Sequence, residues 1–351
     1  MNDMNVDRPE PTPADLALQL ERSFANLLAT LALLEPVEIE SARLEHGWTP
    51  KAVVAHVAFW DEVQLRRMQD AVAGRSATTG FVRPPESNDE RAAGDDARSL
   101  DEVMAAAQSA RRAMVEFAAS LTPVQFAQGY AEGDNTLSLV ERLTHMANHA
   151  RSHARDIGAY CGSMRRWRRD GLRAFLVQQH ANLLDSIAGL DEATILSTHV
   201  CGFWSIRDVL AHVLSWNEFG YLVMKGWPQV DHAAISPWIN GSEDTINANL
   251  LAARADLDMI AIVDWLTTYH RRVLTRYDKL GDAELASSGD QGWGTQGELA
   301  DLLYSLALHA TEHAEDIWRF RAGEAPPPAS PNLGEEPDQR RANDACSWTA
   351  A

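Results

Sequence analysis

The chain has 351 residues, of which 45% are hydrophobic and 23% charged, and its formal net charge is -19. This length and this much apolar material predict two globular domains with packed cores. The acidic excess excludes nucleic acid as a general partner and disfavours anionic membrane surfaces, because both would be repelled.

Four long helices are predicted in the first half of the chain, because apolar residues recur there at spacings of three and four. They cover residues 13–35, 50–73, 99–120 and 137–161. Thr49 followed by Pro50 is typical of a helix start, with an N-cap residue and proline at the first helical position. The polar stretch between the second and third helices is longer than a hairpin loop needs, which predicts a long crossover connection.

The second half repeats this arrangement. Its predicted helices cover residues 171–189, 205–225, 243–279 and 296–321. Ser205 takes the N-cap role that Thr49 has in the first half, and Thr295 with Glu298 has the spacing of a capping box. The expected fold class is therefore all-α, with two tandem four-helix bundles.

Two segments of each half align without a gap, so the chain is a duplicated unit. Residues 24–62 match residues 180–218, and residues 147–157 match residues 307–317. The paired residues are Trp48 with Trp204, His56 with His212, Trp60 with Trp216, Glu62 with Glu218, His149 with His309, His153 with His313, and Asp156 with Asp316. The predicted domains are copy 1 at 13–162 and copy 2 at 170–323, joined by a basic linker at 163–169. The polar ends, 1–12 and 324–351, are expected to be disordered.

Three inward-facing histidines in each copy predict a metal site. His149 and His153 stand one helical turn apart, so both imidazoles can reach one ion, and His56 on the second helix completes the set. His212, His309 and His313 repeat this set in copy 2. Three nitrogen ligands with open positions are typical of a catalytic site. The alternative, hydrogen-bonded core histidines, is disfavoured by two aligned triads, because burying an imidazole without a partner is costly.

Two alternative roles are open for each of the other polar residues near the triads. Glu62 and Glu218 follow the helix-two histidine by six residues, so each is a further ligand or general base, or else a solvated helix residue. Asp156 and Asp316 are acceptors for the ligand imidazoles, or else form salt bridges near helix ends. The paired tryptophans are expected to form core or pocket wall.

The segments WSIRDVLAHVLSWNE and HATEHAEDI of copy 2 resemble the DinB-like superfamily, and look closest to its ClbS/DfsB group. Copy 1 matches more loosely, through WTPKAVVAHV and NHARSH. The resemblance implies a four-helix bundle with a long crossover and a zinc, nickel or similar ion on the three histidines of each copy. It also implies thiol-dependent transfer, or self-protection by hydrolysis of a reactive electrophile.

The leading hypothesis is a cytoplasmic metal-dependent enzyme, a hydrolase or thiol transferase that acts on a small electrophilic molecule. A low-molecular-weight thiol is a candidate cofactor, and a homodimer is left open. The alternative is a binding protein that sequesters a reactive or toxic ligand without converting it. Three widely spaced cysteines and a polar N-terminus without an apolar core disfavour secretion, and no apolar run has the length of a membrane span.

Overall fold

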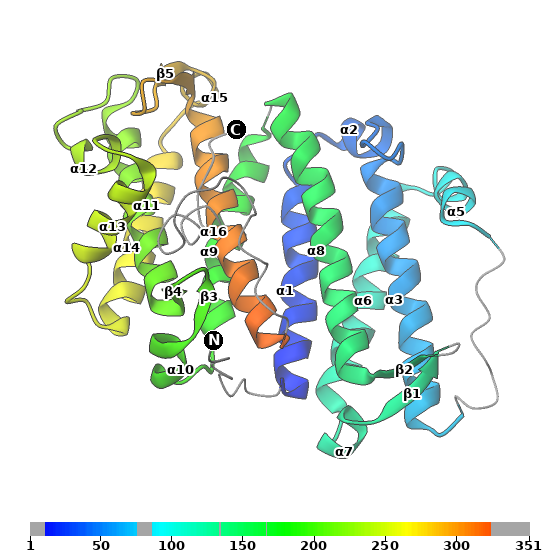
Figure 1. Ribbon diagram of the computed structural model, residues 1–351. Coiled ribbons are helices and arrows are strands. Elements are labelled where there is room, and N and C mark those ends of the chain that lie inside the picture. The colour runs from blue at the N-terminus through cyan, green and yellow to red at the C-terminus, as the bar shows by residue number, and fades with distance from the viewer. Residues whose placement is uncertain (1–10, 76–85, 133–134, 166, 324–351) are drawn as a thin grey trace, which may run out of the picture. The chain divides into compact units, whose positions relative to one another are not determined.

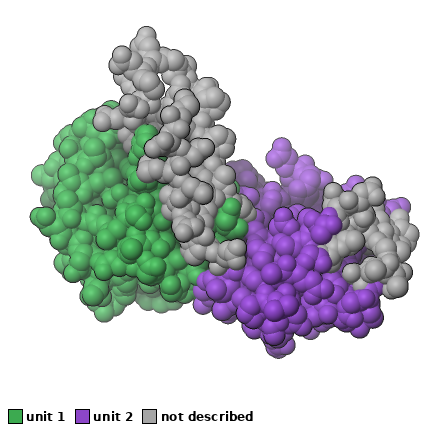
Figure 2. Space-filling model, turned by 60° about the horizontal axis from the view of Figure 1, so that its bottom comes forward, with its two compact units in different colours: residues 1–8, 172–351 green, residues 9–171 purple. Residues whose placement is uncertain are grey.

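The computed structural model describes residues 11–75, 86–132, 135–165 and 167–323. It divides into two compact units, residues 9–171 and residues 172–351 with 1–8, drawn in purple and green in Figure 2. We call them the first bundle and the second bundle. The ends predicted to be disordered, 1–12 and 324–351, lie outside the described residues except for positions 11 and 12.

The first bundle is built from four long helices that lie side by side in Figure 1. These are α1 (Pro13–Leu31), α3 (Pro50–Val72), α6 (Leu100–Ser120) and α8 (Leu139–Met164). Its short elements are α2 (Pro36–Ser41), α5 (Asn88–Asp95), α7 (Pro123–Phe126) and the hairpin of β1 (Gly129–Glu132) and β2 (Asn135–Ser138). All four predicted helices of this copy are present, and the short elements are additions.

The second bundle repeats the plan. Its long helices are α9 (Arg169–Ile187), α11 (Ile206–Gly226), α14 (Met259–Tyr277) and α16 (Leu299–Arg321). Its short helices are α10 (Glu192–Ser197), α12 (Ser236–Ile239), α13 (Glu243–Ala252) and α15 (Asp282–Leu285). Two hairpins pair β3 (His199–Cys201) with β4 (Trp204–Ser205), and β5 (Ser288–Asp290) with β6 (Gln296–Glu298). The all-α class with tandem bundles is confirmed. No helix within the described ranges is both long and apolar enough to cross a membrane.

The helix that carries each helix-two histidine starts as predicted. The Thr49 hydroxyl accepts from Ala52 N at 3.0 Å, and Ser205 accepts from Asp208 N at 3.1 Å. The capping box predicted at Thr295 is wrong, because residues 296–298 pair with β5 as a strand and α16 begins only at Leu299.

Replacing Thr49 with alanine is expected to lower the free energy of unfolding of the first bundle by about 1–2 kcal/mol. Thr49 is fully buried, so water cannot replace the hydrogen bond that Ala52 N loses. Urea denaturation of the full chain measures the loss. The control is Thr122→Ala, which removes an exposed N-cap from the short helix α7. An equal loss of unfolding free energy in this variant would contradict the prediction.

The single helix predicted at 243–279 is wrong, because the chain breaks into α13 and α14. Arg207, near the start of α11, donates to the carbonyl oxygens of Arg254, Ala255 and Leu257 at 2.8 to 2.9 Å. The Asp258 carboxylate then caps α14 by accepting from Ala261 N at 2.7 Å. A side chain distant in sequence therefore satisfies the carbonyl groups that the break leaves without helical partners.

In the first bundle Lys51, which is aligned with Arg207, likewise donates to backbone carbonyl oxygens at the end of the crossover. Its ammonium donates to the carbonyl oxygens of Asp96 at 3.2 Å and Arg98 at 2.8 Å, just before α6 begins. The start of α6 therefore lies beside the start of α3. The second and third long helices run in the same direction, as the predicted crossover requires.

Candidate metal centres

In the first bundle the three predicted histidines meet through their Nε2 atoms. His149 Nε2 lies 3.0 Å from His56 Nε2 and 3.2 Å from His153 Nε2. His56 comes from α3, while His149 and His153 lie one turn apart on α8. Two helices thus direct three ring nitrogens at one point.

The second bundle reproduces this arrangement with closely similar distances. His309 Nε2 lies 2.9 Å from His212 Nε2 and 3.0 Å from His313 Nε2. His212 belongs to α11, and the other two belong to α16. In both triads all three donor atoms lie within 4.8 Å of one another.

These contacts fit ligands that share an ion better than a hydrogen-bond chain. An imidazole Nε2 carries either one hydrogen or one lone pair, so the central nitrogen of each triad cannot form a normal hydrogen bond with both neighbours. Ligands about 2.1 Å from zinc lie about 3.0–3.4 Å from one another. The separations from the central nitrogen of each triad match or lie close to this range. Each triad could therefore hold a divalent ion.

Burial favours the neutral form, which is the form that binds metal, in four of these imidazoles. Burial, reinforced by the neighbouring His153, lowers the pKa of His56 to about 3, and burial with the adjacent imidazoles lowers that of His149 to about 2. Burial likewise holds the pKa of His212 and His309 well below the usual value. At neutral pH these four rings are therefore free of the extra proton that would exclude an ion.

The paired aspartates lie beside the last histidine of each triad. Asp156 Oδ2 is 3.0 Å from His153 Nδ1, and Asp316 Oδ2 is 3.6 Å from His313 Nδ1. A proton on His153 Nδ1 that is donated to Asp156 leaves the Nε2 lone pair pointing at the triad. In the first bundle Asp156 is therefore placed as the acceptor for a ligand imidazole, which was one of its two expected roles. In the second bundle Asp316 lies beyond hydrogen-bond distance of His313.

Aromatic rings wall both triads, as expected for the paired tryptophans. The centroid of the Trp48 ring is 4.9 Å from that of His56, and the centroid of Trp204 is 4.6 Å from that of His212. Trp60 and Trp216 lie one turn after these histidines, with centroids at 6.3 and 6.2 Å. Such walls exclude water and favour apolar or aromatic ligands.

Trp293, which was not predicted, packs against the wall residue Trp216. Its ring lies 5.7 Å from Trp216 and 4.5 Å from Phe219, at the turn between β5 and β6. Gly292 before it has φ +98°, and an added Cβ there would lie 2.9 Å from Ile235 Cδ1. Only glycine fits that position. A tryptophan between two glycines, in GWG, was the available signal.

The two predicted catalytic glutamates have different surroundings. Glu62 is half exposed, and its carboxylate lies 4.0 Å from the Arg66 guanidinium. Glu218 is mostly buried, accepts from the Tyr269 hydroxyl at 2.5 Å and pairs with Arg254. Both Glu218 oxygens are thus engaged, so a base role would require one of these partners to be released. The catalytic role of both glutamates stays a prediction.

The triads differ in exposure. His212, His309 and His313 have exposed fractions of 1%, 2% and 3%, whereas His149 and His153 in the first bundle are only partly buried. His145, which could have joined the first triad, stacks on His149 with centroids 6.4 Å apart and lies outside the converging set. The first triad is therefore the more accessible of the two.

Comparison with known proteins identifies the family to which the chain belongs. The model of the DinB superfamily matches the chain twice, over residues 19–157 and 176–317, so each bundle is one match. No curated protein and no solved structure matches the chain. The two matches span most of both bundles and include every histidine of the two triads. The chain is therefore a member of the DinB superfamily, with two tandem copies of its domain.

Proposed function

We propose that each triad binds one divalent metal ion, zinc or nickel, and that the protein is a metal-dependent enzyme acting on a small electrophilic molecule. The observation that carries this proposal is the convergence of three imidazole Nε2 atoms in both bundles. When bound, such an ion supplies a Lewis acid that lowers the pKa of water or of a thiol at the site. Hydrolysis and thiol transfer both use this chemistry.

The first bundle is the better candidate for catalysis. Its triad is partly accessible, and Asp156 fixes the His153 tautomer so that Nε2 can act as a ligand. Trp48, whose Nε1 donates to Asp89 Oδ1 of α5 at 2.8 Å, connects the crossover to the site wall. Glu62 and Glu218 are proposed as the assisting bases of the two copies. Detoxification, likeness to the ClbS/DfsB group, a cytoplasmic location, a thiol cofactor and a homodimer are sequence-based parts of this proposal.

Metal analysis of the full chain, purified without a histidine tag, tests the sites directly. We expect two ions per chain, and one ion after His309→Ala with His313→Ala, because the remaining imidazole cannot hold an ion alone. His145→Ala is the matched control, since it removes a neighbouring imidazole outside the triad. The proposal is wrong if the full chain carries no stoichiometric metal ion under metal-replete conditions.

The second candidate function is sequestration of a reactive ligand without turnover. It is favoured by the second triad, which is almost fully closed behind Trp204 and Trp216. Product formation separates the two functions. A ligand that raises the melting temperature but is recovered unchanged after long incubation supports sequestration, and a product that disappears in His149→Ala supports catalysis in the first bundle.

A further inference from the structure

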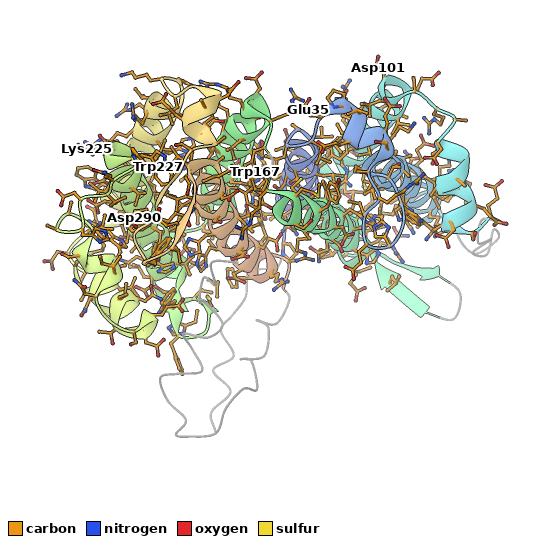
Figure 3. The ribbon with its side chains drawn as sticks, turned by 90° about the horizontal axis from the view of Figure 1, so that it is seen from above. Glu35, Asp101, Trp167, Lys225, Trp227 and Asp290 are labelled. Carbon is orange, nitrogen blue, oxygen red and sulfur yellow. The ribbon has the colours of Figure 1, made fainter. Side chains whose placement is uncertain are left out.

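A strongly basic groove lies on the second bundle, although the chain as a whole is acidic. Its volume is about 400 Å³, and it lies between α11 and the C-terminal part of α14. The five cations that line it are Lys225, Arg271, Arg272, Arg276 and Lys279. Tyr221 and Thr275 complete the lining, so the groove has no carboxylate. Figure 3 labels Lys225 at the surface of the bundle.

These cations have no carboxylate partner among the ion pairs of the described residues. Other arginines of the same bundle do pair, since Arg173 is 2.7 Å from Asp278 and Arg254 contacts Glu218. On α14 the cations at 272 and 276 are spaced by four, so like charges share one helix face, and Lys279 follows in the turn just after the helix. Such spacing is unfavourable in isolation.

The ends of α11 and α14 explain only part of this charge. Both helices end beside the groove, and each helix C-terminus carries about half a negative charge. Together they offset about one of the five cations. The groove therefore keeps an excess of about four positive charges, well beyond what helix capping uses.

The fold does not need this cluster, because the first bundle lacks it. Alignment of α3 with α11 through the paired histidines, and of α6 with α14 through their N-caps, gives the equivalent positions. They hold Gln69, Arg112, Ala113, Phe117 and Ser120. One cation in the first bundle thus corresponds to five in the second.

One arginine is held in place by aromatic rings. The Arg272 guanidinium carbon lies 5.1 Å from the Tyr269 ring centroid, 5.6 Å from that of Tyr221 and 5.9 Å from that of Trp265. The Tyr269 ring is fixed in turn, because its hydroxyl donates to Glu218. An arginine fork positioned in this way loses little entropy when it binds an oxyanion.

We propose that this groove is a binding site for a compact polyphosphate group, carried by a small molecule with two or three linked phosphates. Arginine forks match phosphate oxygens in bidentate pairs, and a single phosphate monoester carries only about −1.5 to −2 charge. Linked phosphates fit the excess charge better. The proposal is independent of the metal sites.

Isothermal titration of the full chain with tripolyphosphate at physiological salt tests the proposal. We expect saturable binding of one ion per chain, weakened at least tenfold by Arg272→Gln with Arg276→Gln. Lys225→Gln, a milder variant at an exposed position, should weaken it less. The matched control is Arg112→Gln with Arg319→Gln, which makes the same charge change outside the groove and should leave the affinity within twofold.

Chelation of a histidine-bound metal by tripolyphosphate would not respond to the arginine variants, so equal binding by variant and control overturns the proposal. So does the absence of saturable binding. A second arm uses phosphatidylcholine vesicles with and without 5% of a bisphosphorylated phosphoinositide. Vesicle binding lost in the same variants assigns the phosphates to a lipid headgroup, and binding of free tripolyphosphate alone assigns them to a soluble ligand.

Discussion

Asp61→Asn is expected to lower the free energy of unfolding of the first bundle by about 3–5 kcal/mol, because it leaves a buried guanidinium without its counter-charge. Asp61 is 0% exposed and Arg111 2%. Their bidentate pair has nitrogen to oxygen distances of 2.7 and 3.1 Å. Arg111 also donates to the Leu20 carbonyl at 3.2 Å, which fixes it in the core between α1 and α3.

Urea denaturation of the metal-free full chain, followed by circular dichroism, measures this loss. Asp70→Asn is the control in the same bundle, since the Asp70 pair with Arg75 is solvent-exposed and worth about 0–1 kcal/mol. Asp61→Leu with Arg111→Met should recover most of the stability, because removal of both charges leaves nothing uncompensated. Equal effects of Asp61→Asn and Asp70→Asn would show that the buried pair contributes no more than a surface one.

The second bundle places neutral groups where the first has this ion pair. Asn217 is aligned with Asp61, His270 with Arg111, and His180 with Phe24. All three line one small cavity of about 30 Å³, with the His180 and His270 rings stacked 4.0 Å apart. The duplicated unit therefore keeps its histidine triad while its core polar group changes from a charged pair to two imidazoles.

Much of the fold and of the candidate site could be predicted from periodicity and repetition. The eight long segments were correct in number, and the inward faces of α3, α8, α11 and α16 follow from apolar spacing alone. Because both copies carry His, Trp and Asp at the same register, the alignment singled out the residues that converge. The convergence of His56, His149 and His153 could be predicted from the helical repeat alone.

The rest depends on contacts between residues far apart in the sequence. The break after α13 is stabilised by Arg207, some fifty positions earlier, so local propensity alone predicted one continuous helix. The strand at 296–298 exists because β5 pairs with it, and its residues have no strong strand preference. The basic groove lies between two helices whose cations are separated in sequence, and only the packing of these helices reveals the cluster.

The second bundle is expected to lose stability as the pH falls, through His180 and His270. Burial lowers the pKa of His180 to about 4, and burial with the adjacent His180 and Arg173 charges lowers that of His270 to about 3. In the unfolded chain both titrate near 6.5, so between that pH and the folded values the unfolded state binds more protons. The stabilisation is complete above pH 6.5 or so and decreases toward pH 4, by about 2 kcal/mol for each histidine between pH 7.5 and 5.

Urea denaturation at a series of pH values, on the metal-free full chain, measures this slope. His180→Phe with His270→Gln should flatten it by about 4 kcal/mol over that range, since neither new side chain titrates there. Phenylalanine occupies the aligned position of the first bundle, at Phe24, so the fold accommodates it. The control is His199→Gln on β3, which removes an exposed imidazole from the same bundle. An unchanged slope in the double variant would mean that the stacked pair is already solvated in the folded protein, and that the cavity beside it admits water and protons freely.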